Sequence, residues 1–155
     1  MRRLLRAVLA AIPIVLSQTP QAIAEVIDDI TLERLGSVNR IRLRFTGPVH
    51  YLRQARSLDG TAANVYLQAL EPEAFGPPAT IDEVKHSPRF TGVPSFRVRA
   101  RLDPRCDPAP NPVCLIIQLD RAARYTIRPG PDRRSLLIDF ASDAGGRSPN
   151  AGKER

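Results

Sequence analysis

Hydrophobic and polar residues alternate along much of the chain, and this alternation predicts β-strands. In RIRLRF, residues 40–45, the three large apolar side chains fall on one face of a strand and the three arginines on the other. SFRVRARL, residues 95–102, has the same pattern. Further apolar runs are ITLERL at 30–35, VYLQAL at 65–70, CLIIQLD at 114–120 and SLLIDF at 135–140. Helical periodicity is almost absent, so the sequence predicts an all-β protein.

One segment of the chain occurs twice. IRLRFTGPVHY at 41–51 aligns with LIIQLDRAARY at 115–125, which places Tyr51 on Tyr125, and an apolar run follows each copy. We therefore expect two similar units of about three strands each. If their apolar faces pack together, the fold is a small β-sandwich of two roughly three-stranded antiparallel sheets with internal pseudo-symmetry. A shorter extended piece begins at Tyr51, and the proline-rich stretch 71–94 is a connection with one short strand near 81–85.

The N-terminus has the features of an export signal. Arg2, Arg3 and Arg6 precede an apolar run at 7–16, and small residues end at Ala24. That apolar run is shorter than the roughly 20 residues of a membrane-spanning helix, which argues against an uncleaved anchor. The sequence predicts a signal peptide at 1–24, cleaved near Ala24, a domain at 25–141 in the periplasm with no membrane span, and a disordered tail at 142–155 that lacks large apolar residues.

The basic charge narrows the classes of partner. Three of the basic residues lie in the predicted signal, so the formal charge of +7 falls to +4 after cleavage. Nearly all basic residues are arginines, which pair in two-pronged fashion with carboxylates and phosphates. An exported protein meets such groups on wall polymers and acidic lipids, and it does not meet nucleic acid.

The two cysteines favour a structural disulfide. Cys106 and Cys114 flank DPAPNPV, a proline-rich loop between two apolar runs. In an oxidising compartment this spacing is typical of a bridge that closes a hairpin. The alternative is a redox-active pair, which usually has two residues between its cysteines.

The combination of an export signal and two copies of strand, turn, tyrosine and apolar strand resembles the AMIN domain of Gram-negative envelope proteins. The resemblance covers roughly residues 27–140, and CLIIQLDRAARYTI through SLLIDF matches best. It implies a β-sandwich of two symmetric three-stranded sheets and a role as a targeting module at peptidoglycan. The chain departs from the family pattern in its cysteine-bounded insertion and shows no downstream catalytic or channel-forming domain.

Two rows of arginines are the candidate binding residues. Residues two apart on a strand point to the same face, so each row presents several guanidinium groups to one ligand. One interpretation is a surface for an anionic polymer such as peptidoglycan, and the other is an ordinary solvated face that also hinders edge-to-edge aggregation. The two interpretations differ in whether the rows are contiguous or neutralised by acidic residues. The rows are Arg40, Arg42 and Arg44, and Arg97, Arg99 and Arg101.

The remaining candidates favour structure over chemistry. Tyr51 and Tyr125 recur at equivalent positions, which favours packing beneath a turn over a stacking surface for sugar rings. His50 and His86 have no neighbouring ligand pattern for a metal, and no serine-nucleophile motif is present. A small hydrolase is the weakest of the functional hypotheses. The sequence predicts no catalytic residue, no metal and no cofactor.

These observations predict a non-catalytic, exported envelope module that binds peptidoglycan or another anionic wall component. The alternative is a periplasmic adaptor or subunit that binds a partner envelope protein through an exposed sheet edge. The ligand, the binding face and the oligomeric state do not follow from the sequence.

Overall fold

The computed structural model describes residues 25–76 and 81–141, and these form nine strands and one short 3₁₀ helix. The predicted signal peptide at 1–24 and the predicted tail at 142–155 lie outside the described residues. No helix of the described part is long and apolar enough to cross a bilayer. The elements are β1 (Ile27–Leu35), β2 (Val38–Phe45), β3 (Val49–Arg56), β4 (Ala62–Ala69), η1 (Pro72–Phe75), β5 (Ile81–His86), β6 (Phe96–Leu102), β7 (Pro112–Leu119), β8 (Tyr125–Pro129) and β9 (Ser135–Ala141).

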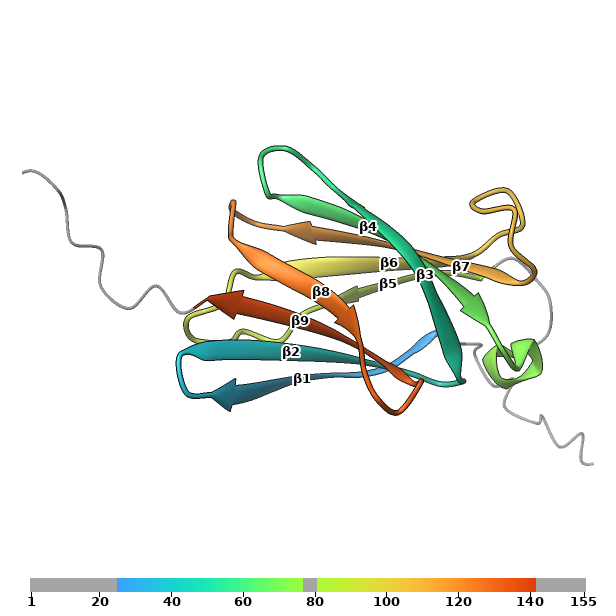
Figure 1. Ribbon diagram of the computed structural model, residues 1–155, viewed down its shortest axis with the longest axis horizontal. Coiled ribbons are helices and arrows are strands. Elements are labelled where there is room, and N and C mark those ends of the chain that lie inside the picture. The colour runs from blue at the N-terminus through green and yellow to red at the C-terminus, as the bar shows by residue number, and fades with distance from the viewer. Residues whose placement is uncertain (1–24, 77–80, 142–155) are drawn as a thin grey trace, which may run out of the picture.

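The strands form two antiparallel sheets, as expected for a β-sandwich (Figure 1). One sheet has four strands in the order β1-β2-β9-β8, and the other has five in the order β3-β4-β7-β6-β5. The all-β class is confirmed, but the expected count of about three strands per sheet is wrong. The strands missing from that count are β3, β5 and β8, and all three lie at sheet edges. Edge strands bury fewer side chains, so their hydrophobic alternation is weak.

The internal repeat is present in the topology, although it does not divide the molecule into one sheet per unit. Strands β1 to β4 correspond to β6 to β9, since the order β1-β2-β9-β8 becomes β6-β7-β4-β3 under that exchange. Each sheet thus takes two strands from each unit. The reason lies in the turns at 46–48 and 120–124, which lead the chain from one sheet into the other. The two units are interlocked, and β5 is an addition to the edge of one sheet.

The core lies between the sheets and consists mainly of aliphatic side chains, as the low aromatic content predicts. The inward residues of β2 and of β7, such as Leu43 and Ile117, are essentially inaccessible to solvent. Their neighbours along each strand point outward, which is the alternation seen in the sequence. Phe45 and Phe75 are the largest fully buried side chains.

Side chains bridge both open sides of the sandwich. On one side, a carboxylate oxygen of Glu83 in β5 accepts hydrogen bonds from the backbone N–H groups of Val26 (2.6 Å) and Ile27 (3.1 Å) at the start of β1. On the other side, the Tyr125 hydroxyl of β8 donates to the carbonyl of Ala62 in β4 at 3.0 Å. These contacts connect the two sheets at their edges, where the strands of one sheet do not pair with those of the other.

Candidate functional site

The two arginine rows lie on opposite faces of the molecule. The β2 row belongs to the four-stranded sheet and the β6 row to the five-stranded sheet, and in each strand the residues between the arginines are buried in the core. The arginines therefore point outward in opposite directions. The two rows are therefore not contiguous, and a single ligand surface cannot include both of them.

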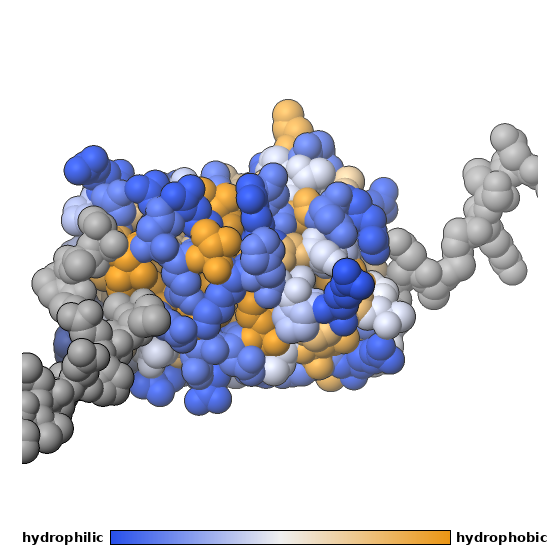
Figure 2. Space-filling model, turned by 180° about the vertical axis from the view of Figure 1, so that it is seen from behind, coloured by the Kyte–Doolittle hydropathy of each residue, from blue (hydrophilic) through white to orange (hydrophobic). Residues whose placement is uncertain are grey.

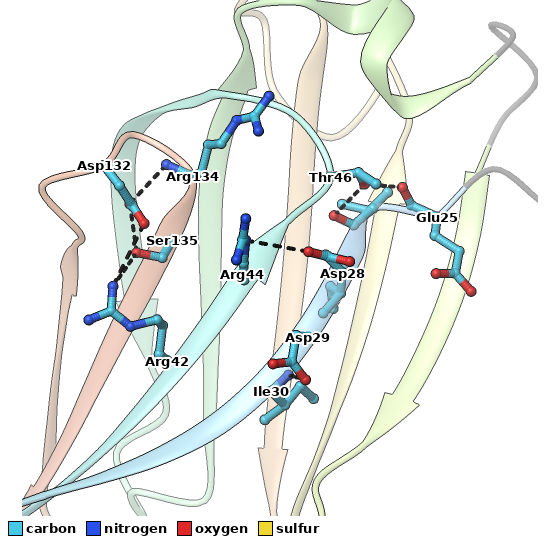
Figure 3. A network of polar contacts seen from close by, with 12 residues as sticks. Glu25, Asp28, Asp29, Ile30, Arg42, Arg44, Thr46, Asp132, Arg134 and Ser135 are labelled. Atoms are coloured by element: carbon cyan, nitrogen blue, oxygen red, sulfur yellow. Dashed lines mark hydrogen bonds and ion pairs between the residues drawn. The ribbon is translucent and has the colours of Figure 1, made fainter.

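Acidic residues pair with the whole β2 row. The pairs are Arg40 with Asp139 at 2.6 Å, Arg42 with Glu33 at 2.7 Å and Arg44 with Asp28 at 3.4 Å, measured from nitrogen to oxygen. Figure 3 shows Arg44 directed toward Asp28, and Arg42 beside Ser135 of the neighbouring strand. The hydrogen bond from Arg40 holds the pKa of the Asp139 carboxyl below its usual range.

The β2 row also covers an apolar residue. Leu137 of β9 lies opposite Arg42 on one side and Arg128 on the other, so all three point to the outer face. Its side chain is nonetheless only 2% exposed, and it lies outside the core cluster. Arginine side chains can cover apolar surface with their methylene stems while their charged ends reach water or a carboxylate. We attribute the burial of Leu137 to these stems, which gives the β2 row a structural role.

The β6 row is held in the same way. The partners are the amide oxygen of Gln118 for Arg97 at 2.6 Å, the carboxylate of Asp82 for Arg99, and that of Asp103 for Arg101 at 3.0 Å. The Arg99 contact lowers the pKa of the Asp82 carboxyl. Five of the six candidate arginines are thus in ion pairs and the sixth is hydrogen-bonded. Neither row presents a line of free guanidinium groups.

The cysteine-bounded loop is closed by a disulfide between Cys106 and Cys114, as the spacing predicts. Asp107 within the loop is buried, and its carboxylate accepts a hydrogen bond from the Ala109 N–H and another from Arg53 of β3 at 2.9 Å. These two contacts lower its pKa. The guanidinium of Arg53 in turn lies 3.7 Å from the ring centre of Tyr66. The loop is therefore fastened to the outer face of the five-stranded sheet.

The two repeat tyrosines differ in their surroundings. Tyr125 is buried, its ring lies 5.7 Å from that of Phe140, and its hydroxyl reaches the backbone of β4. Tyr51 is half-buried and packs against the edge of the core. Burial raises the pKa of both hydroxyls. Tyr125 joins the two sheets, and neither ring belongs to a flat exposed surface of the kind that stacks on sugars.

Exposed arginines without an ion pair or a side-chain hydrogen bond in the described residues lie at both ends of the sandwich. Arg105, Arg133 and Arg134 lie at one end, and four more lie at the other. The second of these ends, called the loop end below, contains the β1–β2, β3–β4, β5–β6 and β7–β8 connections, on the left of Figure 1. The side chains of four exposed arginines there make no ion pair or hydrogen bond within the described residues: Arg34, Arg89, Arg121 and Arg124. Single arginines in separate turns form no pattern in the sequence, so sequence analysis missed them.

A hollow of about 560 Å³ opens at the loop end. Arg121 and Arg124 line it together with Asp59 and Gly60 of the β3–β4 turn and Phe140 of β9. The two turns touch closely, because a Cβ atom on Gly60 would lie 3.0 Å from the carbonyl oxygen of Ala123. The backbone of Gly60 also has a positive φ of 70°, so the turn favours glycine on both counts.

The acidic residue of the hollow is held by its own turn. Hydrogen bonds from the Ser57 hydroxyl and from Thr61 lower the pKa of Asp59 to about 2. Its carboxylate oxygen accepts from the Thr61 N–H at 3.0 Å and from the Thr61 hydroxyl at 2.8 Å. Asp59 therefore stays ionised, so the hollow presents an anion with the two guanidinium groups of Arg121 and Arg124 beside one carboxylate, a net positive charge.

Clusters of metal-ligating side chains are not found in the described part of the chain. No group of three or more His, Cys, Asp or Glu side chains there could hold a metal ion, and His50 and His86 lie exposed on different strands. Comparison with protein-family models, with curated proteins and with solved structures gives no match. The resemblance to AMIN domains therefore continues as a proposal.

Proposed function

We propose that this protein is a non-catalytic, AMIN-like module of the cell envelope that binds an anionic wall component through its loop end. The observation that supports it most is that Arg121 and Arg124, whose guanidinium groups have no partner in the described residues, line a hollow at the loop end. The guanidinium groups of the strand rows already contact carboxylates or an amide, whereas those of Arg34, Arg89, Arg121 and Arg124 have no such partner in the described residues.

This contrast matters energetically. An anion that binds a paired arginine must displace a carboxylate, so it exchanges one ion pair for another and gains little. An unpaired guanidinium adds a charge-assisted hydrogen bond without that exchange. Arg121 and Arg124 also stand at the rim of a hollow, which would shield their contacts from water.

The rest of the surface also favours a polar ligand. The large apolar side chains that are exposed lie on separate elements: Leu35, Leu58, Leu70, Val84 and Ile116. Figure 2 shows a mostly hydrophilic face with hydrophobic spots separated from one another. A wall polymer with repeated stem-peptide carboxylates fits such a surface better than an apolar ligand does.

The proposed location is the periplasm. The disulfide is compatible with export into an oxidising compartment, and the predicted signal at 1–24 would supply the route. In this proposal the module has no chemistry of its own and serves to hold the protein at the wall.

Co-sedimentation with purified sacculi tests the proposal. The protein should pellet with sacculi at low salt and be released as salt rises, because its contacts are ionic. Arg121→Ala/Arg124→Ala should reduce the bound fraction several-fold. The matched control is Arg133→Ala/Arg134→Ala, which removes the same charge from exposed arginines in the β8–β9 turn, at the other end of the sandwich. Equal losses in both variants would indicate non-specific charge attraction, and failure of the unaltered protein to pellet at any ionic strength would exclude wall binding.

A further inference from the structure

The four edge strands of the sandwich differ in how well they could accept another strand. An exposed edge presents unpaired backbone N–H and C=O groups, and proteins usually block it with a bulge, a proline, a charge or a covering side chain. The edges here are β1 and β8 of one sheet and β3 and β5 of the other. Comparing them shows which one is open.

Three of the edges carry a blocking feature. The pairing of β1 with β2 is irregular between Ile27 and Asp29, and that of β3 with β4 is irregular between Tyr51 and Arg53. Such bulges twist an edge away from a flat partner. The third edge, β8, is five residues long and ends at Pro129, and Arg56 donates a hydrogen bond to the carbonyl of its first residue at 2.7 Å.

The fourth edge, β5, has charged side chains but no bulge and no proline. Its pairing with β6 runs without interruption from Ile81 to His86. The hydrogen bond from the Ser87 N–H to the Phe96 carbonyl fixes which residues face β6. By the alternation of an antiparallel ladder, the backbone groups of Asp82, Val84 and His86 point to the free side. Val84 is 51% exposed on the outer face.

The sequence of β5 is complementary to itself. When two copies of IDEVKH run antiparallel with Val84 at the two-fold axis, Asp82 lies opposite His86 of the second copy and Glu83 lies opposite Lys85 of the second copy. Opposite-charge pairs directly across a ladder are stabilising, and like charges are destabilising. Moving the axis by one residue would place Glu83 against Glu83, or Lys85 against Lys85. Of these three registers, only the one centred on Val84 places no like charges opposite each other. Within one copy Asp82 also contacts Arg99, and Glu83 and Lys85 contact the start of β1.

From these observations we propose that β5 is a dimerisation edge, which pairs antiparallel with β5 of a second copy of this chain and joins the two five-stranded sheets. Closed two-fold symmetry is the commonest arrangement of homo-oligomers and requires this kind of self-complementary contact. The proposal is independent of the anionic ligand, because the β5 edge and the loop-end arginines are different residues.

Cysteine cross-linking tests the register. Val84 of each copy would be about 5.5 Å apart between Cα atoms, which is within the range of a disulfide. In the full chain, Val84→Cys should form a covalent dimer under mild oxidation. The control is Ile116→Cys, which places an exposed thiol on the outer face of the same sheet but in the central strand β7. Cross-linking of Ile116→Cys as fast as Val84→Cys would overturn the proposal.

Charge exchange tests the contacts without a new thiol. In sedimentation velocity the unaltered protein should show a concentration-dependent dimer. His86→Asp places like charges opposite Asp82 twice by symmetry and should weaken the dimer roughly tenfold. The exchanged variant Asp82→His/His86→Asp should restore it. A protein that stays monomeric throughout, or whose Val84→Cys form cross-links only to a different protein, would contradict pairing with a second copy.

Discussion

Arg40 and Asp139 form a two-pronged ion pair between strands that come from the two halves of the repeat. The Arg40 Nε lies 2.6 Å from one carboxylate oxygen and Nη2 lies 3.1 Å from the other, although the residues are 99 positions apart in sequence. Arg128 of β8 approaches the same carboxylate at 3.4 Å. One aspartate thus connects β2, β9 and β8 on the outer face, so an arginine of a candidate binding row contributes to holding the sheet together.

Asp139→Asn should therefore destabilise the fold. The substitution keeps the shape but removes the charge that two arginines share, and we expect the free energy of unfolding to fall by about 1–2 kcal/mol. Urea unfolding followed by circular dichroism measures it. Asp120→Asn is the control, because the Asp120 side chain is exposed and makes no ion pair within the described residues. If the free energy of unfolding falls equally little in both variants, the ion pair does not stabilise the fold.

Arg42 should stabilise the protein through its stem as well as through its charge. Since its methylenes cover Leu137, Arg42→Ala should cost about 1 kcal/mol, and Arg42→Met, which keeps an apolar stem without the charge, should recover roughly half of that. Thermal unfolding of the two variants compares them. Equal melting temperatures of the two variants would show that Arg42 stabilises the protein only through its charge. Burial of Leu137 by the Arg42 methylenes would then contribute nothing to stability.

The stability of the protein should depend on pH mainly in the acid range. Hydrogen bonds and neighbouring arginines lower the pKa values of Asp82, Asp107 and Asp139, and hydrogen bonds lower that of Asp59 to about 2. A carboxyl whose pKa is lower in the folded state stabilises the fold fully above its unfolded value of about 3.9. That stabilisation is lost as pH falls through the folded pKa. The melting temperature should stay level from about pH 8 to 5 and fall below about pH 4.

Reduction of the disulfide should loosen one loop of the protein and lower its stability. The loop-entropy model assigns a bridge of this short span about 2.5 kcal/mol. Because the bridge holds Asp107 near Arg53, reduction should also release the ion pair between them. Melting with and without a phosphine reductant measures the loss, and the Arg53→Ala variant should lose less on reduction than the unaltered protein. An identical loss in both would show that the bridge and the ion pair are independent.

Sequence pattern and structure agree where burial is one-sided and differ where contacts are long-range. The strands with a continuous buried face, such as β2 and β6, were predicted because their alternation is strong. For the edge strand β3 the sequence predicts only a short extended piece from Tyr51, since few of its side chains are buried. The repeat predicted two related units but not their interlocking, which depends on how the turns at 46–48 and 120–124 direct the chain. The pairing of Arg40 with Asp139 depends on that same arrangement and has no signature in the sequence.

Glu83 offers a final test, of how the sandwich is closed beside β5. Its carboxylate accepts the N–H groups of Val26 and Ile27, and Lys85 also donates to the Ile27 carbonyl, so two side chains of β5 hold the start of β1. Glu83→Gln keeps an acceptor oxygen but loses the charge, and we expect a cost of about 1–2 kcal/mol.

Hydrogen exchange should locate the effect of Glu83→Gln. The amides of Val26 and Ile27 should exchange faster. Those of Glu33 and Leu35 at the far end of β1 should keep their protection, because their backbone groups face β2. Uniformly faster exchange along β1 would mean that Glu83 supports the whole strand. Unchanged exchange at Val26 and Ile27 would mean that the core packing of these two buried side chains, and not the carboxylate, keeps the start of β1 in place.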